Sequence, residues 1–167
     1  AREPGMLRRT RVTLAFFAGE EVNMQGSRAY VREREWPVPA AAVNLEILAQ
    51  DDDYVYWEQD GSVFKLTPTA PEVNALVAAA VTRAAGQAPC PAGPLNSDCA
   101  SFLAAGIPAT TLGTRDHWLG FGGLHGPADH LGRVVMARLP EAVEILGRLV
   151  ELYGSGCPAA AAEVRLA

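Results

Sequence analysis

Several residue types and patterns are scarce in this chain of 167 residues, and each absence excludes a class of protein. Lysine occurs once, at Lys65, and the formal net charge is −5, which argues against nucleic-acid binding because phosphate binding requires a basic patch. The cysteines form no C-x-x-C pair, which argues against a zinc knuckle or redox motif and leaves disulfide formation open; they are Cys90, Cys99 and Cys157. Apolar runs are too short to span a bilayer. A hydrophobic content of 49% suffices for one soluble domain with a core.

The two ends of the chain carry few structural signals. No signal peptide is visible, and the sequence leaves open whether the protein is cytoplasmic or secreted. Too few strands are predicted for a closed core, so we expect a chain that lacks its N-terminal part. Residues 154–167 are rich in alanine and are expected to form a loose tail. The sequence does not indicate an oligomeric state.

Strands and helices alternate along the chain, which predicts an α/β fold with a mixed, mostly parallel sheet between two layers of helices. Apolar and β-branched runs predict buried strands over 10–18, 41–48 and 107–112. A hairpin is expected from strands at 54–57 and 63–66 with a turn at 59–61, and the Pro/Gly-rich stretch 87–94 is expected to be a loop. Apolar spacing and capping residues predict helices over 23–35, from Thr69 to Val81, over 97–106 and over 137–153.

Two adjacent carboxylates follow the first predicted strand directly. Gly19 permits a sharp turn, and Glu20 and Glu21 come next. In open α/β sheets, ligands bind just past the carboxyl ends of strands. Neighbouring side chains point different ways, so one carboxylate can hold a metal while the other faces a substrate. The alternative is a solvated helix start, where acids complement the helix dipole.

Further candidate ligands lie in two other segments. Glu46 is the one charge within the apolar strand 41–48, a costly position unless the carboxylate is paired, bound to metal or at an exposed strand end. All three histidines lie between 117 and 130, and Asp129 follows His125 closely enough to orient its imidazole. Carboxylates and imidazole together suit zinc, with one free carboxylate left as general base.

The loop over 113–126 combines glycine with aromatic side chains. Long loops of this kind that follow a strand often line a binding site. Trp118 and Phe121 are therefore candidates for a substrate wall.

Five short motifs occur in a fixed order: Phe-Phe-Ala-Gly-Glu-Glu at 16–21, Gly-Ser-Arg-Ala-Tyr at 26–30, Val-Asn-Leu-Glu at 43–46, Ser-Asp at 97–98 with Ala-Gly-Ile-Pro-Ala at 105–109, and His125 with Asp129. This order resembles that of the zinc exopeptidases of metallopeptidase family twenty-eight. The resemblance extends from about Arg11 to Leu152. It implies a fold of the zinc-peptidase (phosphorylase/hydrolase-like) type, with residues 1–153 as the C-terminal portion of a single catalytic domain.

The resemblance also implies a function, a zinc-dependent aminopeptidase that hydrolyses terminal bonds of peptides. Glu20 would be the general base toward a metal-activated water. Glu21 and His125 would hold one of the family's two zinc ions. Glu46 would hold the other, in place of the usual aspartate, and Asp129 would support the ligands.

Three departures from the family pattern leave alternatives open. The family's other ligands, a histidine and a bridging aspartate, lie upstream of the Gly-Glu-Glu strand, but no histidine precedes His117; we therefore expect a partial site, inactive in this chain by itself. Leu124 stands where many members have an oxyanion-stabilising tyrosine. Glu46 is one methylene longer than aspartate. The alternatives are a single-zinc glutaminyl-cyclase-like enzyme and a metal-free, non-catalytic binding domain of the same fold.

Overall fold

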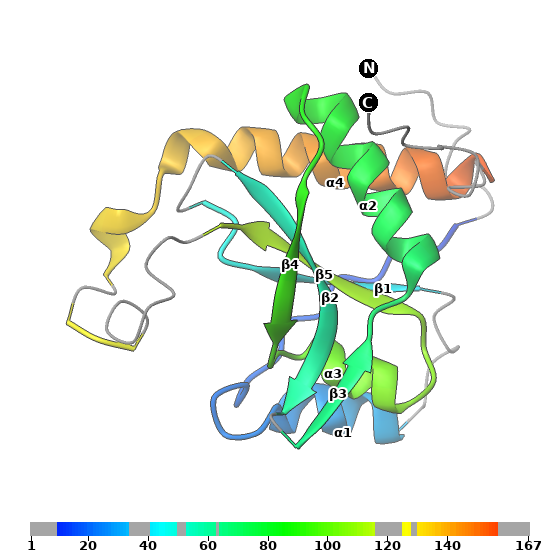
Figure 1. Cartoon of the computed structure of the whole chain (residues 1–167), viewed down its shortest axis with the longest axis vertical. Helices are drawn as coiled ribbons and strands as arrows, with labels where there is room; N and C mark the ends of the chain where they lie inside the picture. The colour runs from blue at the N-terminus through cyan, green and yellow to red at the C-terminus, as the bar shows by residue number, and fades with distance from the viewer. Residues whose placement is uncertain are drawn as a thin grey trace.

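The computed structural model describes residues 10–33, 41–49, 53–62, 64–115, 125–127 and 130–156. The described chain forms one open mixed sheet with two helices on either side of it (Figure 1), which confirms the predicted α/β class. The elements are, in order, α1 (Gln25–Glu33), β1 (Ala42–Glu46), β2 (Tyr54–Ser62), β3 (Lys65–Pro68), α2 (Pro71–Ala85), β4 (Cys90–Leu95), α3 (Cys99–Ala104), β5 (Ala109–Thr114), two short 3-10 turns at Leu131–Arg133 and Met136–Arg138, and α4 (Leu139–Gly154).

The sheet is organised around the long strand β2. One edge of β2 pairs in parallel with β4 along most of its length. The other edge pairs first with β5 and then with β3, both antiparallel. β5 in turn pairs in parallel with β1, which is the last strand on that side among the described residues. The ladders that the structure describes are thus two parallel and two antiparallel.

Each face of the sheet has its own core. α2 and α4 pack together over one face, where Val77, Val81 and Ile145 are fully buried against Tyr54 and Leu112. α1 and α3 cover the other face, and their core consists of Val31, Cys99, Phe102, Ile107 and Ala109. The apolar stripe predicted for the helix at 69–81 is the face that α2 buries. The stripe predicted for 137–153, which included Leu139 and Val143, is misplaced, because α4 buries Ala142, Ile145 and Leu152 while Leu139 and Val143 are exposed. No helix in the described ranges has the length and apolar character needed to cross a membrane.

Three predictions about strands are wrong. Residues 10–18 form no strand, and Leu14 and Phe16 are 77% and 94% exposed, because no strand in the described part of the chain pairs with this segment. The stretch 87–94 is not simply a loop, because Cys90–Leu95 forms β4. β4 pairs only with β2 in the described sheet, and an edge strand tolerates proline because half of its N–H positions need no partner. The turn expected at 59–61 is absent, because β2 continues to Ser62 and places Asp60 inside the sheet.

Candidate active site

The turn that carries Glu20 and Glu21 is fixed to the start of α1. The first amides of a helix have no partner within the helix, and here the carbonyls of the turn accept them. The bonds run from Met24 N to Glu20 O (2.8 Å), from Gln25 N to Gly19 O (3.0 Å) and from Gly26 N to Ala18 O (3.0 Å). The chain reverses through left-handed backbone at Gly19 (φ 73°) and Asn23 (φ 72°). Both carboxylates are therefore held by backbone contacts rather than left on a loose loop.

The position of the turn also depends on close contact with Gly26. A Cβ atom on Gly26 would lie 2.6 Å from the carbonyl oxygen and 2.9 Å from the nitrogen of Ala18. Both are backbone atoms, so no side-chain rotation could relieve the contact. A residue other than glycine at this position would push the Glu20–Glu21 turn away from α1.

We therefore expect Gly26→Ala to destabilise the protein, with a net loss of about 1–2 kcal/mol once the better helix propensity of alanine offsets part of the overpacking. Urea unfolding of the purified protein measures this loss as a lower midpoint. Gly93→Ala is the matched control, because a Cβ on Gly93 meets nothing within 4 Å. Equal midpoints for the two variants would contradict the close packing.

Glu46 is the last residue of β1 and lies on the face of the sheet that α1 and α3 cover. Alternate residues of a strand share a face, and Ala42 packs into the core of α1 and α3. Directly after Glu46 the backbone enters the left-handed region at Ile47 (φ 47°), which is rare for a β-branched residue. The buried Thr114 holds this turn, because both its backbone N–H and its hydroxyl donate to the Ile47 carbonyl.

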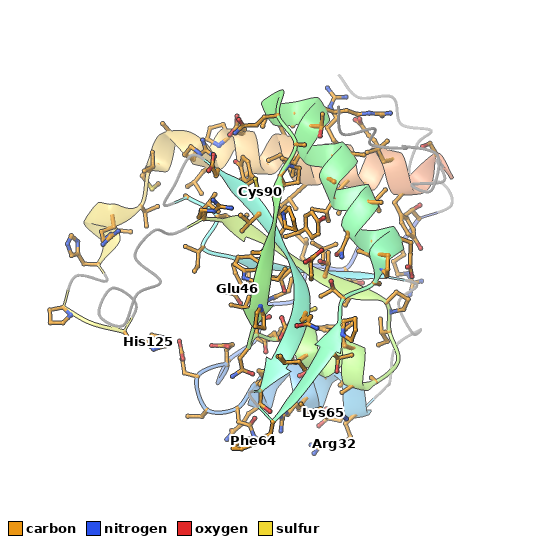
Figure 2. All side chains as sticks on the ribbon, in the orientation of Figure 1. Arg32, Glu46, Phe64, Lys65, Cys90 and His125 are labelled. Atoms are coloured by element: carbon orange, nitrogen blue, oxygen red, sulfur yellow. The ribbon has the colours of Figure 1, made fainter. Side chains whose placement is uncertain are left out.

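The structure brings Glu21 into contact with His125, 104 residues further along the chain. Nε2 of His125 lies 2.7 Å from Oε1 of Glu21, and the two side chains are 60% and 67% exposed. Figure 2 shows His125 beside the blue turn that precedes α1. His125 itself has left-handed backbone (φ 62°), a conformation that costs energy and is found most often at functional sites.

Acidic side chains dominate the electrostatics of the region. Burial raises the pKa of Glu20, and the charges of Glu21, Glu46 and Asp98 raise it further, whereas His125 lowers it. Burial also raises the pKa of Glu46; a hydrogen bond from Asn44 opposes this, and Asp98, Asp60 and Glu21 add to it. These carboxylates therefore lie within electrostatic reach of one another.

The side chains of this region are of the chemical types that bind a cation, and two of them already lie in direct contact. Asp98 is 7% exposed, and its Oδ1 is buried without a hydrogen-bond partner among the described residues, so this oxygen is available to bind a cation. Two ligands of a tetrahedral zinc lie about 3.3 Å apart. Nε2 of His125 and Oε1 of Glu21 are 2.7 Å apart, which is the distance of a direct hydrogen bond, so the two side chains would have to separate slightly to share an ion. Within the described ranges, however, no three histidine, cysteine or acidic side chains are grouped closely enough to hold a metal. Glu46 is thus near the Glu21–His125 pair without joining it.

The remaining predicted site residues cannot be placed. Asp129, Trp118 and Phe121 lie outside the described residues. Two other residues were missed by the sequence predictions: Asp98 appeared only within a Ser-Asp motif, and Asp60 was assigned to a turn. No local signal reveals Asp60, because the second half of β2, residues 58–62, has the composition of a turn and is extended only through its pairing with β3 and β4.

The raised pKa of Glu46 predicts how the metal-free protein responds to pH. A carboxyl whose pKa is higher in the folded than in the unfolded state binds extra protons on folding, so its contribution is present at low pH and is lost as the pH rises through the raised pKa. Glutamine does not titrate, so we expect that Glu46→Gln removes this fall in the free energy of unfolding with rising pH. In chelated protein, the stability advantage of Glu46→Gln over wild type should grow between about pH 4 and about pH 8. A difference in unfolding free energy that is constant or shrinks over this range would contradict the shift.

The sequence of this chain matches a known protein family. Residues 2–147 match the family model for peptidase family M28, and the chain therefore belongs to this family. The resemblance inferred from the five motifs is thereby confirmed. The family that this model describes is a family of peptidases.

Solved structures similar to this chain include several aminopeptidases. An aminopeptidase from Aneurinibacillus sp. strain AM-1 has a TM-score of 0.62 and 24% identity over 81% of this chain and 32% of its own. LapA from Legionella pneumophila has a TM-score of 0.63 and 16% identity over 84% of this chain and 39% of its own. BSAP, a zinc aminopeptidase from Bacillus subtilis, has a TM-score of 0.56 and 17% identity over 83% of this chain and 34% of its own. The chain thus spans about a third of the length of each, and no curated protein matches it.

Proposed function

We propose that this chain forms part of a zinc-dependent aminopeptidase that hydrolyses the terminal bonds of peptides. The observation that carries the proposal is the contact between Glu21 and His125, which joins two zinc-type ligands from distant segments at 2.7 Å beside Glu20. The names of the similar structures support the same activity, since all three are aminopeptidases and BSAP is a zinc enzyme. Activity of the chain by itself is not part of the proposal, because it spans about a third of those proteins.

Each site residue has a proposed role. Glu21 and His125 would hold one zinc ion, Glu46 would contribute to a second, and Asp129 would support the ligands from outside. When bound, zinc supplies Lewis acidity that polarises a carbonyl and lowers the pKa of water. Trp118 and Phe121 would form a wall of the substrate-binding site.

Glu20 would move the proton. It accepts a proton from the attacking water as the new C–O bond forms, and it returns that proton to the amine as the C–N bond breaks. Its carboxyl is suited to this exchange because burial and the neighbouring acids raise its pKa toward the operating pH. The backbone bonds from α1 to the Glu20 turn keep the carboxylate in place during the exchange.

A single-zinc enzyme of the glutaminyl-cyclase type is the second candidate. It is favoured by one observation, namely that Glu21 and His125 touch while Glu46 remains outside their contact. Cyclisation of an N-terminal glutamine would then replace hydrolysis.

One experiment separates these proposals. The complete protein to which this chain is proposed to belong is purified and assayed with an aminoacyl-p-nitroanilide and with a peptide that begins with glutamine, before and after chelation, and its zinc content is measured. Hydrolysis that is lost on chelation and restored by zinc supports the aminopeptidase. Cyclisation alone supports the second candidate, and zinc-free protein without either activity would refute both in favour of a non-catalytic domain.

A further inference from the structure

Asp60 is a fully buried carboxylate (0% exposed) in β2 that the proposed mechanism does not use. Burial of an ionised group is costly unless it is well paired. The partners of Asp60 are neutral groups. Ser97 N donates to its Oδ1 at 3.0 Å, and the hydroxyls of Ser97 and Thr111 donate to its Oδ2 at 2.5 Å and 3.3 Å. Burial of a hydrophobic residue at this position would cost less free energy, so the presence of a carboxylate needs an explanation.

The hydrogen bonds of Asp60 continue to Glu46 through two side chains. Ser97 lies between β4 and α3, and its Oγ is 3.0 Å from Nδ2 of Asn44 in β1. The same Nδ2 is 3.1 Å from Oε1 of Glu46. Asn44 and Glu46 are two residues apart in one strand and so project from the same face. The chain Asp60–Ser97–Asn44–Glu46 thus connects β2 with the end of β1.

The chemistry of Asp60 fixes which group donates and which accepts in each hydrogen bond between Asp60 and Glu46. An ionised carboxylate only accepts hydrogen bonds, whereas a serine hydroxyl has one proton to donate. That proton points to Asp60, so the oxygen of Ser97 presents its lone pairs to Asn44 Nδ2 and to Cys99 N, 3.3 Å away. The Asn44 amide is therefore fixed with its NH2 group, rather than its carbonyl, toward Ser97 and Glu46.

We propose that Asp60 is a positioning residue, which orients the Glu46 carboxylate through Ser97 and Asn44 and leaves its Oε2 directed to a cation. The proposal rests on the proposed function of Glu46 as a zinc ligand and extends it to a buried group outside the site. Residues that hold metal ligands from behind typically contribute a factor of about 10–100 to metal affinity.

The sharpest test is Asp60→Asn, which keeps the shape of the side chain and reverses one hydrogen bond. The new amide would donate to Ser97 Oγ, the serine proton would turn toward Asn44, and two donors would then face each other. We expect the Asn44 side-chain amide resonances in ¹H–¹⁵N spectra of the metal-free protein to shift and to exchange faster with solvent. Zinc affinity, measured by competition with a chelator, should fall by about 10–100-fold.

Two further comparisons show whether Asp60 acts through Glu46. In a Glu46→Gln background, Asp60→Asn should cause little further loss of zinc affinity, because coupled residues are not additive. Thr110→Val is the matched control, since its hydroxyl is fully buried in β5 and has no hydrogen-bond partner among the described residues. Thr110→Val should leave the Asn44 resonances and zinc affinity unchanged. If Asp60→Asn does not fold, Ser97→Ala interrupts the same chain and is expected to shift the same resonances.

The outcomes are distinct. Unchanged Asn44 resonances in Asp60→Asn or Ser97→Ala would overturn the proposal. So would an equal loss of zinc affinity with Glu46 present and absent, which would mean that Asp60 supports only the fold. Should Glu46→Gln itself leave zinc affinity unchanged, the assignment of Glu46 as a ligand fails, and the Asn44 resonances still decide whether Asp60 orients its neighbours.

Discussion

Glu20→Gln is expected to lower kcat for aminopeptide hydrolysis by about 10²–10⁴-fold, the usual contribution of a general base. Glutamine keeps the size of the side chain and its backbone bonds to α1, but it cannot accept a proton. KM and zinc content should change little, because Glu20 is not among the proposed ligands. Steady-state kinetics of the complete protein to which this chain is proposed to belong, together with metal analysis, measure all three quantities.

The control for Glu20→Gln is Glu33→Gln, which removes an exposed carboxylate at the end of α1. It should retain wild-type kcat. A Glu20→Gln enzyme with wild-type kcat would refute the role of this residue. A fall in kcat accompanied by loss of zinc would instead reassign Glu20 as a ligand.

His125→Gly should lower zinc affinity by more than about 100-fold, because the loss of a ligand costs more than the 10–100-fold expected for a supporting residue. Glycine is the appropriate replacement because it accepts the left-handed φ of 62° at this position without strain, so that the loss reports the imidazole alone. Competition with a chromophoric chelator measures the affinity. Activity should fall in parallel at limiting zinc.

His130→Ala provides a matched control for His125→Gly. The imidazole of His130 accepts a hydrogen bond from Gly132 N at 3.2 Å and caps the following 3-10 turn. Its loss should leave zinc affinity unchanged. The double variant Glu21→Ala/His125→Gly should bind zinc little worse than either single variant, since two ligands of one ion are strongly coupled. Simple additivity of the two losses would contradict a shared ion.

Local patterns in the sequence predicted the helices well. The apolar spacing at 69–81 and 137–153 identified α2 and α4, and Gly106 (φ 75°) follows α3 as expected of a helix end. A helix forms its hydrogen bonds within one segment, so its sequence contains most of the information that specifies it. The order of five short motifs likewise sufficed to indicate the family, which the family model confirms.

Strands were predicted less well because their partners are remote in sequence. Residues 10–18 have the composition of a strand, yet they form none where the described sheet offers no pairing. In contrast, Cys90–Leu95 contains two prolines and still pairs with β2 as an edge strand. Asp60 was assigned to a turn because a Gln-Asp-Gly sequence usually forms one, but pairing with β3 and β4 keeps the strand extended through it.

The sequence by itself determined the α/β class, the helices, the family and the chemical types of the site residues, because these depend on composition, periodicity and motif order. Only the tertiary structure decided that Glu21 meets His125 across 104 residues, and that a buried aspartate in β2 connects to Glu46. Contacts of this kind depend on which strands pair and which residues face the same side. No local pattern specifies them, since pairing is chosen by the fold as a whole.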